Sequence, residues 1–342
     1  MTEMSACIAM LEALRDPSMI IDSDERITAI NHPMKALVPS LRIKDPLALA
    51  IRTPDLLDSI RLVLSGQSAQ SIQWREHVPI ERVFDVFVAP LTLDNNRLHV
   101  LVTMRDLTEI KRTERMRVDF IANASHELRT PLASLLGFVE TLQGPAREDK
   151  AAREHFLKIM VEQGRRMSRL IDDLLSLSRV EQHQHLQPTT HVDLVVIVRQ
   201  VVESFSPLAP ERHVKLTLEA PDSLSVIGDR DELIRLAENL IGNAIKYGSL
   251  PDRETQVNII VSQIDSEASL SVRDHGAGIP PEHIPRLTER FYRIDTNASR
   301  ANGGTGLGLA LVKHILLRHR GWLRISSKLN EGSCFEALLP LS

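Results

Sequence analysis

The sequence predicts a multidomain α+β protein built from three consecutive parts. Residues 1–110 mix strand and helix patterns, residues 111–182 carry two long heptad patterns, and residues 183–342 alternate helices with strands. We therefore expect a small α/β domain, then a helical hairpin, then a two-layer α/β sandwich. The chain has 342 residues, enough for two or three domains, and 43% of them are apolar, so each domain can bury a core.

The first part predicts a compact domain of strands and short helices. Two β-prone runs lie within 19–31, and the runs 81–91 and 97–107 predict a hairpin with Asp94 and Asn95 at its turn. The stretch between, roughly 32–70, carries short helical patterns.

The second part predicts two long helices joined by the break at Gly144 and Pro145. Each helix has an apolar heptad, which is typical of a bundle seam. Because the apolar stripes of one hairpin need further partners, we expect two copies to form a homodimeric four-helix bundle. The seam positions are Ile121, Ser125, Leu128, Leu132, Leu135, Val139 and Leu142, then Phe156, Met160, Gln163, Met167, Leu170, Leu174 and Leu177.

The third part follows a polar, histidine-rich linker at 181–191. Helical and strand patterns then alternate, which predicts helices packed on one face of a sheet. The helical patterns cover 192–205, 232–248 and 305–319, and the strand patterns cover 213–220, 256–265, 268–274, 321–328 and 332–340.

Composition narrows the class of protein. Lysine and arginine number 41 and aspartate and glutamate 45, which gives a formal charge of −4 rather than the basic excess of nucleic-acid-binding proteins. Cys7 and Cys334 form no metal-binding pattern, so we expect free thiols in a reducing compartment. No apolar stretch approaches the roughly 20 residues that span a bilayer, and no signal-peptide pattern is present. We expect a cytoplasmic chain, or the cytoplasmic part of an inner-membrane-anchored protein.

A reactive histidine is indicated in the first long helix. His126 lies one residue past a seam position, at the bundle surface, and Glu127 follows it. A carboxylate beside a neutral imidazole can fix its tautomer and raise its basicity. Thr130 lies one turn later on the same face, and Pro131 is expected to bend the helix. A lone surface histidine is usually an ordinary residue, so the surrounding run from 120 to 132 carries the interpretation.

Polar residues of the third part indicate an anion and cation site. Asn239 and Asn243 share a helix face, where amide oxygens suit a hard cation such as Mg²⁺, and Lys246 and Tyr247 follow one turn later. Such a pair of asparagines is more often solvated or capping, so this pattern is weak by itself.

Two glycine-containing runs complete the predicted site. In the first, Asp274 ends a strand and is followed by Gly276 and Gly278, so its carboxylate can accept a hydrogen bond from a base while backbone packs closely. An isolated run of this kind is usually a β-turn. The second, 303–314, places glycines at a helix start, where backbone amides can bind phosphates. Its residues of interest are Gly304, Gly306, Leu307 and Gly308.

These runs, in this order, resemble the motifs of two-component sensor histidine kinases. Residues 120–132 resemble the H-box, 238–248 the N-box, 273–280 the first glycine box, 291–293 the F-box and 303–314 the second glycine box. The resemblance implies that ATP and Mg²⁺ bind the third part, with Asn243 as metal ligand and Asp274 at the adenine. It implies autophosphorylation of His126 with Glu127 as base, transfer to an aspartate of a response regulator, and a phosphatase role for Thr130.

The first part is similar to a PAS sensor domain, and the combination most resembles the phosphate-regulon sensor kinases, which implies phosphate-starvation signalling. Two alternatives stay open. The chain could be a chaperone-type or topoisomerase-type ATPase of the same superfamily, which has no reason to carry His126 in an H-box. It could also be a sensor or scaffold with an inactive kinase, although Asn243, Asp274 and the glycines are all intact.

Overall fold

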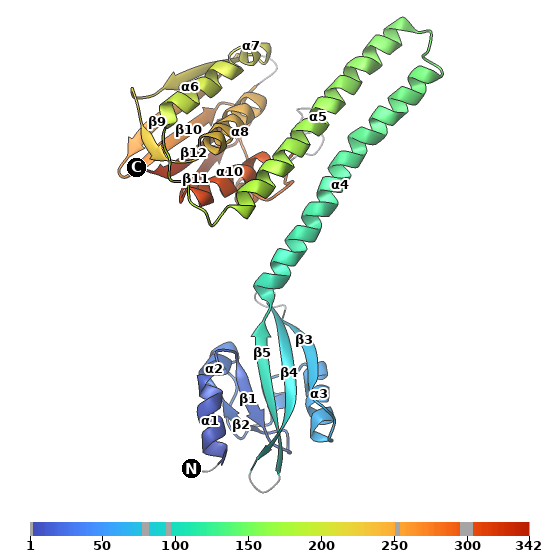
Figure 1. Ribbon diagram of the computed structural model, residues 1–342, viewed down its shortest axis with the longest axis vertical. Coiled ribbons are helices and arrows are strands. Elements are labelled where there is room, and N and C mark those ends of the chain that lie inside the picture. Colours follow the sequence, from blue (N-terminus) through green and yellow to red (C-terminus); the bar gives the residue numbers. More distant parts are fainter. Residues whose placement is uncertain (1–2, 77–81, 94–96, 250–253, 295–303, 342) are drawn as a thin grey trace. The chain divides into compact units, whose positions relative to one another are not determined.

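The computed structural model describes residues 3–76, 82–93, 97–249, 254–294 and 304–341 (Figure 1). The chain divides into two compact units, Met1–Ile121 and Ala122–Ser342. Within the described residues, no helix is both long enough and apolar enough to cross a membrane. Cys7 and Cys334 are free, as the sequence predicts.

The first unit is built on an antiparallel sheet with the strand order β2-β1-β5-β4-β3 among the described residues. The predicted strands and hairpin are confirmed, whereas β3 and the first helix are additions that the sequence patterns did not indicate. Asp94 and Asn95 lie outside the described residues. The elements are α1 (Glu3–Ala13), β1 (Ser18–Ile21), β2 (Ile27–Ile30), α2 (His32–Leu37), η1 (Leu47–Leu49), α3 (Pro54–Leu64), β3 (Gln70–Glu76), β4 (Arg82–Leu93) and β5 (Arg97–Asp106).

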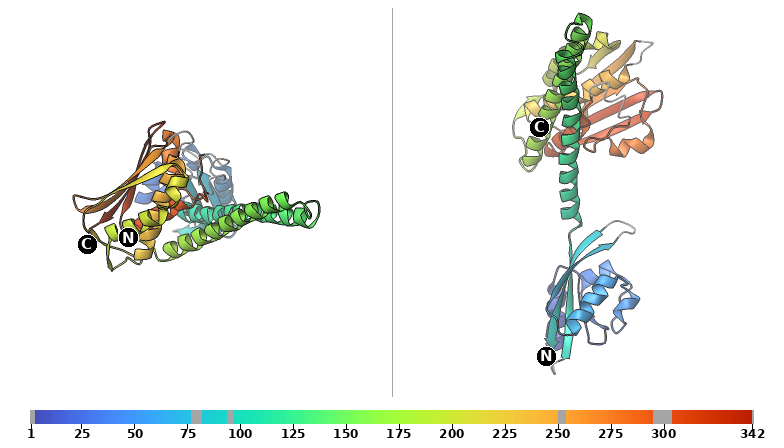
Figure 2. Two further views of the ribbon diagram at one scale, coloured as in Figure 1. Left: turned by 90° about the horizontal axis from the view of Figure 1, so that it is seen from above. Right: turned by 90° about the vertical axis from the view of Figure 1, so that its right-hand side faces the viewer.

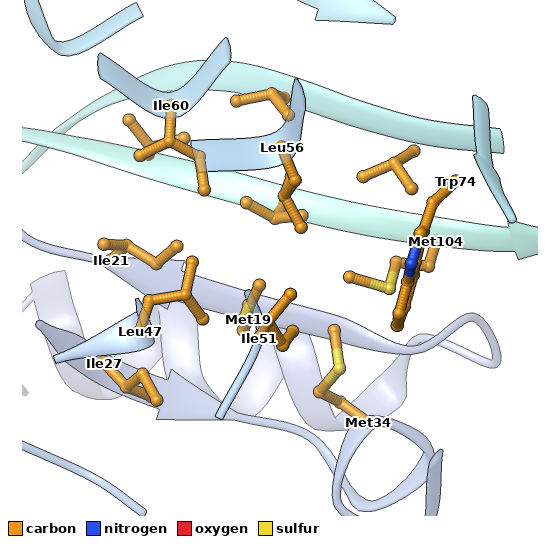
Figure 3. Packing of buried hydrophobic residues seen from close by; sticks show 14 of the residues in the cluster. Met19, Ile21, Ile27, Met34, Leu47, Ile51, Leu56, Ile60, Trp74 and Met104 are labelled. Atoms are coloured by element: carbon orange, nitrogen blue, oxygen red, sulfur yellow. The ribbon is translucent and has the colours of Figure 1, made fainter. Parts of the chain in front are cut away.

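The core of this unit lies between the sheet and the helices that follow β2 (Figure 3). Fully buried aliphatic side chains of α3 pack onto Met19 and Met104 of the sheet, and each such side chain stabilises the fold by about 1.5–3 kcal/mol. Asn31, which follows β2, is fully buried. Its Oδ1 accepts hydrogen bonds from the backbone N–H of Ser18 and of Met34, at 2.9 and 3.0 Å, and so joins β1 to the start of α2.

The helical hairpin consists of α4 (Thr108–Gln143) and α5 (Lys150–Gln182), which run antiparallel (Figures 1 and 2). Asp149 caps α5 by accepting a hydrogen bond from the N–H of Ala152 at 3.0 Å. The predicted heptad of α5 faces inward: Leu170 and Leu177 are buried, and the rings of Phe156 and Phe138 stack at 5.2 Å.

A second apolar stripe of the hairpin is exposed, and the predicted heptads only partly include it. Leu132 and Leu136 of α4 are 47% and 57% exposed, and four residues of α5 continue the pattern at helical spacing. Those four are Leu157, Val161, Ile171 and Leu175, each between 44% and 54% exposed. The exposed apolar stripe of α5 is therefore displaced from its predicted heptad.

The C-terminal α/β layer has the strand order β11-β12-β10-β9-β7 in the described residues, with β7 parallel to β9 and the other pairs antiparallel. Helices α6, α8 and α10 cover one face of this sheet (Figures 1 and 2), which confirms the predicted two-layer sandwich. The elements are β6 (His191–Asp193), α6 (Leu194–Phe205), α7 (Leu208–Glu211), β7 (Val214–Glu219), β8 (Ser225–Ile227), α8 (Arg230–Gly248), β9 (Thr255–Ile264), β10 (Glu267–Asp274), η3 (Pro281–Arg286), α10 (Gly308–Arg318), β11 (Trp322–Lys328) and β12 (Gly332–Pro340).

Candidate active site

His126 is exposed on α4, as the sequence predicts. Thr130, one turn later, is also exposed, and its Oγ1 donates a hydrogen bond to the backbone carbonyl of His126 at 3.2 Å. The bend predicted at Pro131 does not interrupt α4, which runs through this residue as one helix. The two side chains therefore share an accessible face at the middle of the helix.

Glu127 lies in an ionic cluster. Its Oε2 accepts hydrogen bonds from Arg166 of α5 and from Arg293, both at 3.1 Å. The side chains of Arg166 and Arg293 are only 15% and 5% exposed, so these contacts are shielded from water. Sequence reasoning assigned Glu127 to His126 and missed both arginines. The F-box resemblance was the signal that could have indicated Arg293.

The N-box residues lie on α8, which begins where Asp229 accepts hydrogen bonds from the N–H groups of Asp231 and Glu232. Asn239 is fixed by a hydrogen bond from its Nδ2 to the carbonyl of Arg235 at 2.8 Å. Asn243 and Lys246 are half-buried on the following turns, and Tyr247 is 47% exposed. Burial, with a further contribution from the charge of Arg169, lowers the pKa of Lys246.

Asp274 ends β10 and is only 4% exposed. Its Oδ1 accepts a hydrogen bond from the N–H of Gly276 at 2.9 Å, and burial raises the pKa of the carboxyl group. The backbone after Asp274 passes very close to the end of α8. A Cβ atom at Gly276 would lie 2.1 Å from the carbonyl oxygen of Tyr247, and one at Gly248 would lie 2.9 Å from the Cβ of Asp274. These glycines are therefore required for the approach of the two segments.

The second glycine run brings α10 to the same place. Gly306 has a φ of +75°, and its carbonyl accepts a hydrogen bond from the N–H of Phe291 at 2.8 Å. Gly308 begins α10, and a Cβ there would lie 2.3 Å from Oδ1 of Asn239. Residues 295–303, between the F-box resemblance and the second glycine run, lie outside the described residues. The helix N-terminus beside Asn239 is a favourable place for phosphate oxygens.

Close contacts thus join the residues that the sequence predicts to bind a nucleotide. Asn239 meets Gly308, Tyr247 meets Gly276, and Phe291 meets Gly306. Gly278, with a φ of +73°, contacts the backbone at Lys328. A buried carboxylate at one end and a helix N-terminus with a half-buried lysine at the other fit an adenine nucleotide, and the amide of Asn243 fits a cation that the phosphates bring.

The hairpin also contacts this domain through α5, which the sequence patterns did not indicate. Asp173 Oδ2 accepts a hydrogen bond from Thr305 Oγ1 at 2.8 Å. Glu181 Oε1 lies 2.5 Å from a nitrogen of Arg290 and 3.4 Å from Nε2 of His314. The two acids are eight residues apart on one helix, so a single face of α5 makes both contacts.

Comparison with protein families gives two matches. Residues 116–183 match the family described as the His Kinase A (phospho-acceptor) domain. Residues 228–342 match the family described as histidine kinase-, DNA gyrase B- and HSP90-like ATPase. The first range contains the helices with His126 and Glu127, and the second contains Asn243 and Asp274.

Individual proteins are also similar to this chain. Phosphate regulon sensor protein PhoR of Pseudomonas aeruginosa is 40% identical over 245 residues, which are 72% of this chain and 54% of PhoR. Sensor-like histidine kinase SenX3 of Mycobacterium tuberculosis is 35% identical over 252 residues, covering 74% and 60%. The crystal structure of histidine kinase ThkA in complex with response regulator protein TrrA matches with a TM-score of 0.53 and 20% identity, over 98% of both chains, which shows likeness of fold. The chain spans about half to three fifths of the length of these curated relatives.

Proposed function

Because the chain belongs to the two-component sensor histidine kinases, we propose that it uses ATP to phosphorylate His126 and transfers this phosphoryl group to an aspartate of a response regulator. The observation that carries the proposal is the contact between the two sites. Arg293 lies two residues after Phe291, which binds Gly306, and Arg293 itself binds Glu127 beside His126.

We assign the nucleotide to the groups around α8 and α10. Asp274 would accept a hydrogen bond from the adenine amino group while Gly276 and Gly278 allow the base to approach backbone. The triphosphate would lie toward Lys246 and the start of α10. Mg²⁺ held at Asn243 would neutralise charge on the phosphates when bound. The remaining contacts are assigned to Asn239, Tyr247, Gly304, Gly306, Leu307 and Gly308.

In the proposed reaction a ring nitrogen of His126 attacks the γ-phosphorus in line. A nitrogen–phosphorus bond forms, the bond to the bridging oxygen breaks, and ADP leaves. Glu127 would accept a hydrogen bond from the other ring nitrogen and stabilise the charge that develops on the imidazole. Since Arg166 and Arg293 both bind Oε2 of Glu127 in this structure, the imidazole would share this carboxylate with the two guanidinium groups.

We propose that two chains pair through the exposed apolar stripe of the hairpin. Small residues interrupt the stripe on α5: Gly164 and Ser168 stand between Val161 and Ile171, and a Cβ at Gly164 would meet nothing within 4 Å. A facing helix could therefore approach closely there. Pairing would bury side chains that are now about half exposed.

The remaining assignments rest on the resemblance and on the relatives. We propose the domain boundaries 1–110, 111–182 and 183–342, with a PAS-like sensor first. Thr130 would orient water on the aspartyl phosphate of the regulator, although its described hydrogen bond is to the helix backbone. The likeness to a phosphate regulon sensor supports phosphate-starvation signalling. A chaperone or topoisomerase would have no use for His126.

Labelled ATP tests the proposed function directly. The purified chain should acquire label on the protein, and acid should release it, because a phosphoramidate is acid-labile and a phosphoserine is not. His126→Gln should bind nucleotide and acquire no label. His185→Gln, at an exposed histidine beyond α5, should label like the parent protein. Acid-stable label, or acid-labile label in His126→Gln, would refute the assignment.

A further inference from the structure

The contact between α5 and the second glycine run places a carboxylate where phosphates are expected to bind. Asp173 places a carboxylate on Thr305, which stands between Gly304 and Gly306. The same hydroxyl oxygen of Thr305 accepts a hydrogen bond from the N–H of Leu307, at 3.3 Å, immediately before α10 begins. An anion supplied by α5 therefore sits at the positive end of α10.

The charges that act on Asp173 have the opposite sign. Its carboxylate is attracted by Lys246 and Arg235 of α8 and by Arg169 of its own helix. Burial raises the pKa of Asp173 and lowers that of Lys246, because both groups are largely removed from water. The opposite charges of Asp173 and Lys246 attract each other at this partly buried position. The carboxylate of Asp173 therefore partly neutralises the positive charge of Lys246.

We propose that Asp173 is an internal competitor of the nucleotide: its carboxylate occupies the place of the terminal phosphates, so that docking of α5 and binding of ATP oppose each other. The inference rests on the proposed function, because the phosphates are assigned to Lys246 and the start of α10. A phosphate and a carboxylate at one place compete for the same hydrogen-bond donors, and their like charges repel.

The competition has a reciprocal consequence. If docked Asp173 weakens ATP binding by some factor, ATP weakens the docking of α5 by the same factor. Nucleotide binding would then weaken the contact between the α5 face and the ATP-binding domain. Docked Asp173 would thus act against nucleotide binding through its hydrogen bond with Thr305.

The test compares two neighbouring carboxylates in the full chain. Asp173→Asn keeps the shape and the hydrogen-bonding capacity and removes the charge. Asp172→Asn makes the same charge change at an exposed position of the same turn, whose side chain has no described contact with the ATP-binding domain. Titration calorimetry measures the affinity for two ligands. The magnesium complex of the β,γ-imido analogue of ATP carries phosphates, and adenosine does not.

Asp173→Asn should bind the ATP analogue about fivefold more tightly than the parent, a modest coupling by the standards of allosteric proteins, whereas Asp172→Asn should not differ. Adenosine, which lacks phosphates, should bind both variants like the parent. Unchanged or weaker analogue binding by Asp173→Asn would overturn the proposal, as would equal tightening for adenosine. If the parent itself binds no nucleotide, the proposed function fails, which is a separate result.

Hydrogen exchange gives a second reading of the same coupling. Backbone amides in the C-terminal half of α5 should exchange faster in the parent when the ATP analogue is added. In Asp173→Asn they should exchange faster already without nucleotide and respond less to it. Slower exchange on adding the analogue would mean that ATP strengthens the docking, and would contradict the competition.

Discussion

Replacing Gly276 by alanine probes the closest approach in the candidate site. The added Cβ would lie 2.1 Å from the carbonyl oxygen of Tyr247 and 3.0 Å from the Cα of Gly248, whereas ordinary contacts begin at 3.4 Å. The obstructing atoms are backbone, so no side-chain rotation can relieve the clash. One of the two segments must move by roughly 1 Å, and overpacking of this kind costs about 1–3 kcal/mol.

We expect that displacement to weaken mainly the binding of the nucleotide. The moved segments carry Asp274 and the end of α8, so a loss of 1.4 kcal/mol would correspond to about tenfold weaker binding. The assay is calorimetric titration with the β,γ-imido ATP analogue, accompanied by thermal unfolding. Gly137→Ala is the matched control, because a Cβ at Gly137 on α4 meets nothing within 4 Å.

The control variant should bind nucleotide like the parent and gain slightly in helix stability, since alanine is the better helix former by about 1 kcal/mol. The reasoning would be refuted if Gly276→Ala bound the analogue with the affinity of the parent. It would also be refuted if both glycine variants lost affinity equally, because the loss would then not depend on the close approach.

Four further outcomes are expected. Asp274→Asn should weaken ATP binding at least tenfold in calorimetry, since a charge-assisted hydrogen bond of about 1.5–3 kcal/mol is lost, while sedimentation still shows a dimer. Thr130→Ala should keep autophosphorylation, but a phosphorylated regulator mixed with this variant should lose its phosphate several-fold more slowly than one mixed with the parent. Equal rates of phosphate loss would mean that Thr130 has only a structural role. Leu136→Lys should shift sedimentation toward the monomer, because a charge would enter the bundle seam. Burial lowers the pKa of His319, whose Nε2 accepts a hydrogen bond from the N–H of Asp229, so the histidine is neutral in the folded protein. The unfolded chain therefore binds the additional proton, and the melting temperature should fall as the pH drops below about 6.5, less steeply in His319→Gln.

The apolar periodicity of the sequence predicted most helices and strands, but not which surfaces each helix packs against. The order of helices and strands after residue 183 follows from local patterns, because each element shows its own apolar face in sequence. The hairpin was predicted for the same reason. On α5 the predicted heptad residues Leu170 and Leu177 are buried, while the exposed apolar stripe lies beside that heptad, so this helix carries apolar residues on more than one face.

Within the candidate site, the resemblance to family motifs indicated which residues belong to the site, whereas only the structure shows the contacts between them. Asn239, Asp274 and the glycines could be named from motif order, and the structure shows why glycine is needed at 276, 306 and 308. The ion pairs of Glu127 and Glu181 and the hydrogen bond of Asp173 with Thr305 could not be predicted, because each joins residues more than 35 positions apart. No local pattern encodes such pairs. The sequence patterns also did not indicate β3 and α1, because both are short and α1 has no clear apolar face.

The contact between Asn239 and Gly308 also constrains how this protein can diverge. Any side chain at position 308 would collide with Oδ1 of Asn239, so the first substitution there is harmful while asparagine is present. Shortening residue 239 first would open room, yet it would also remove the amide that is fixed on Arg235. A substitution at position 308 is thus tolerated only after residue 239 has been shortened, and the two positions, about seventy residues apart in sequence, should vary together across related chains.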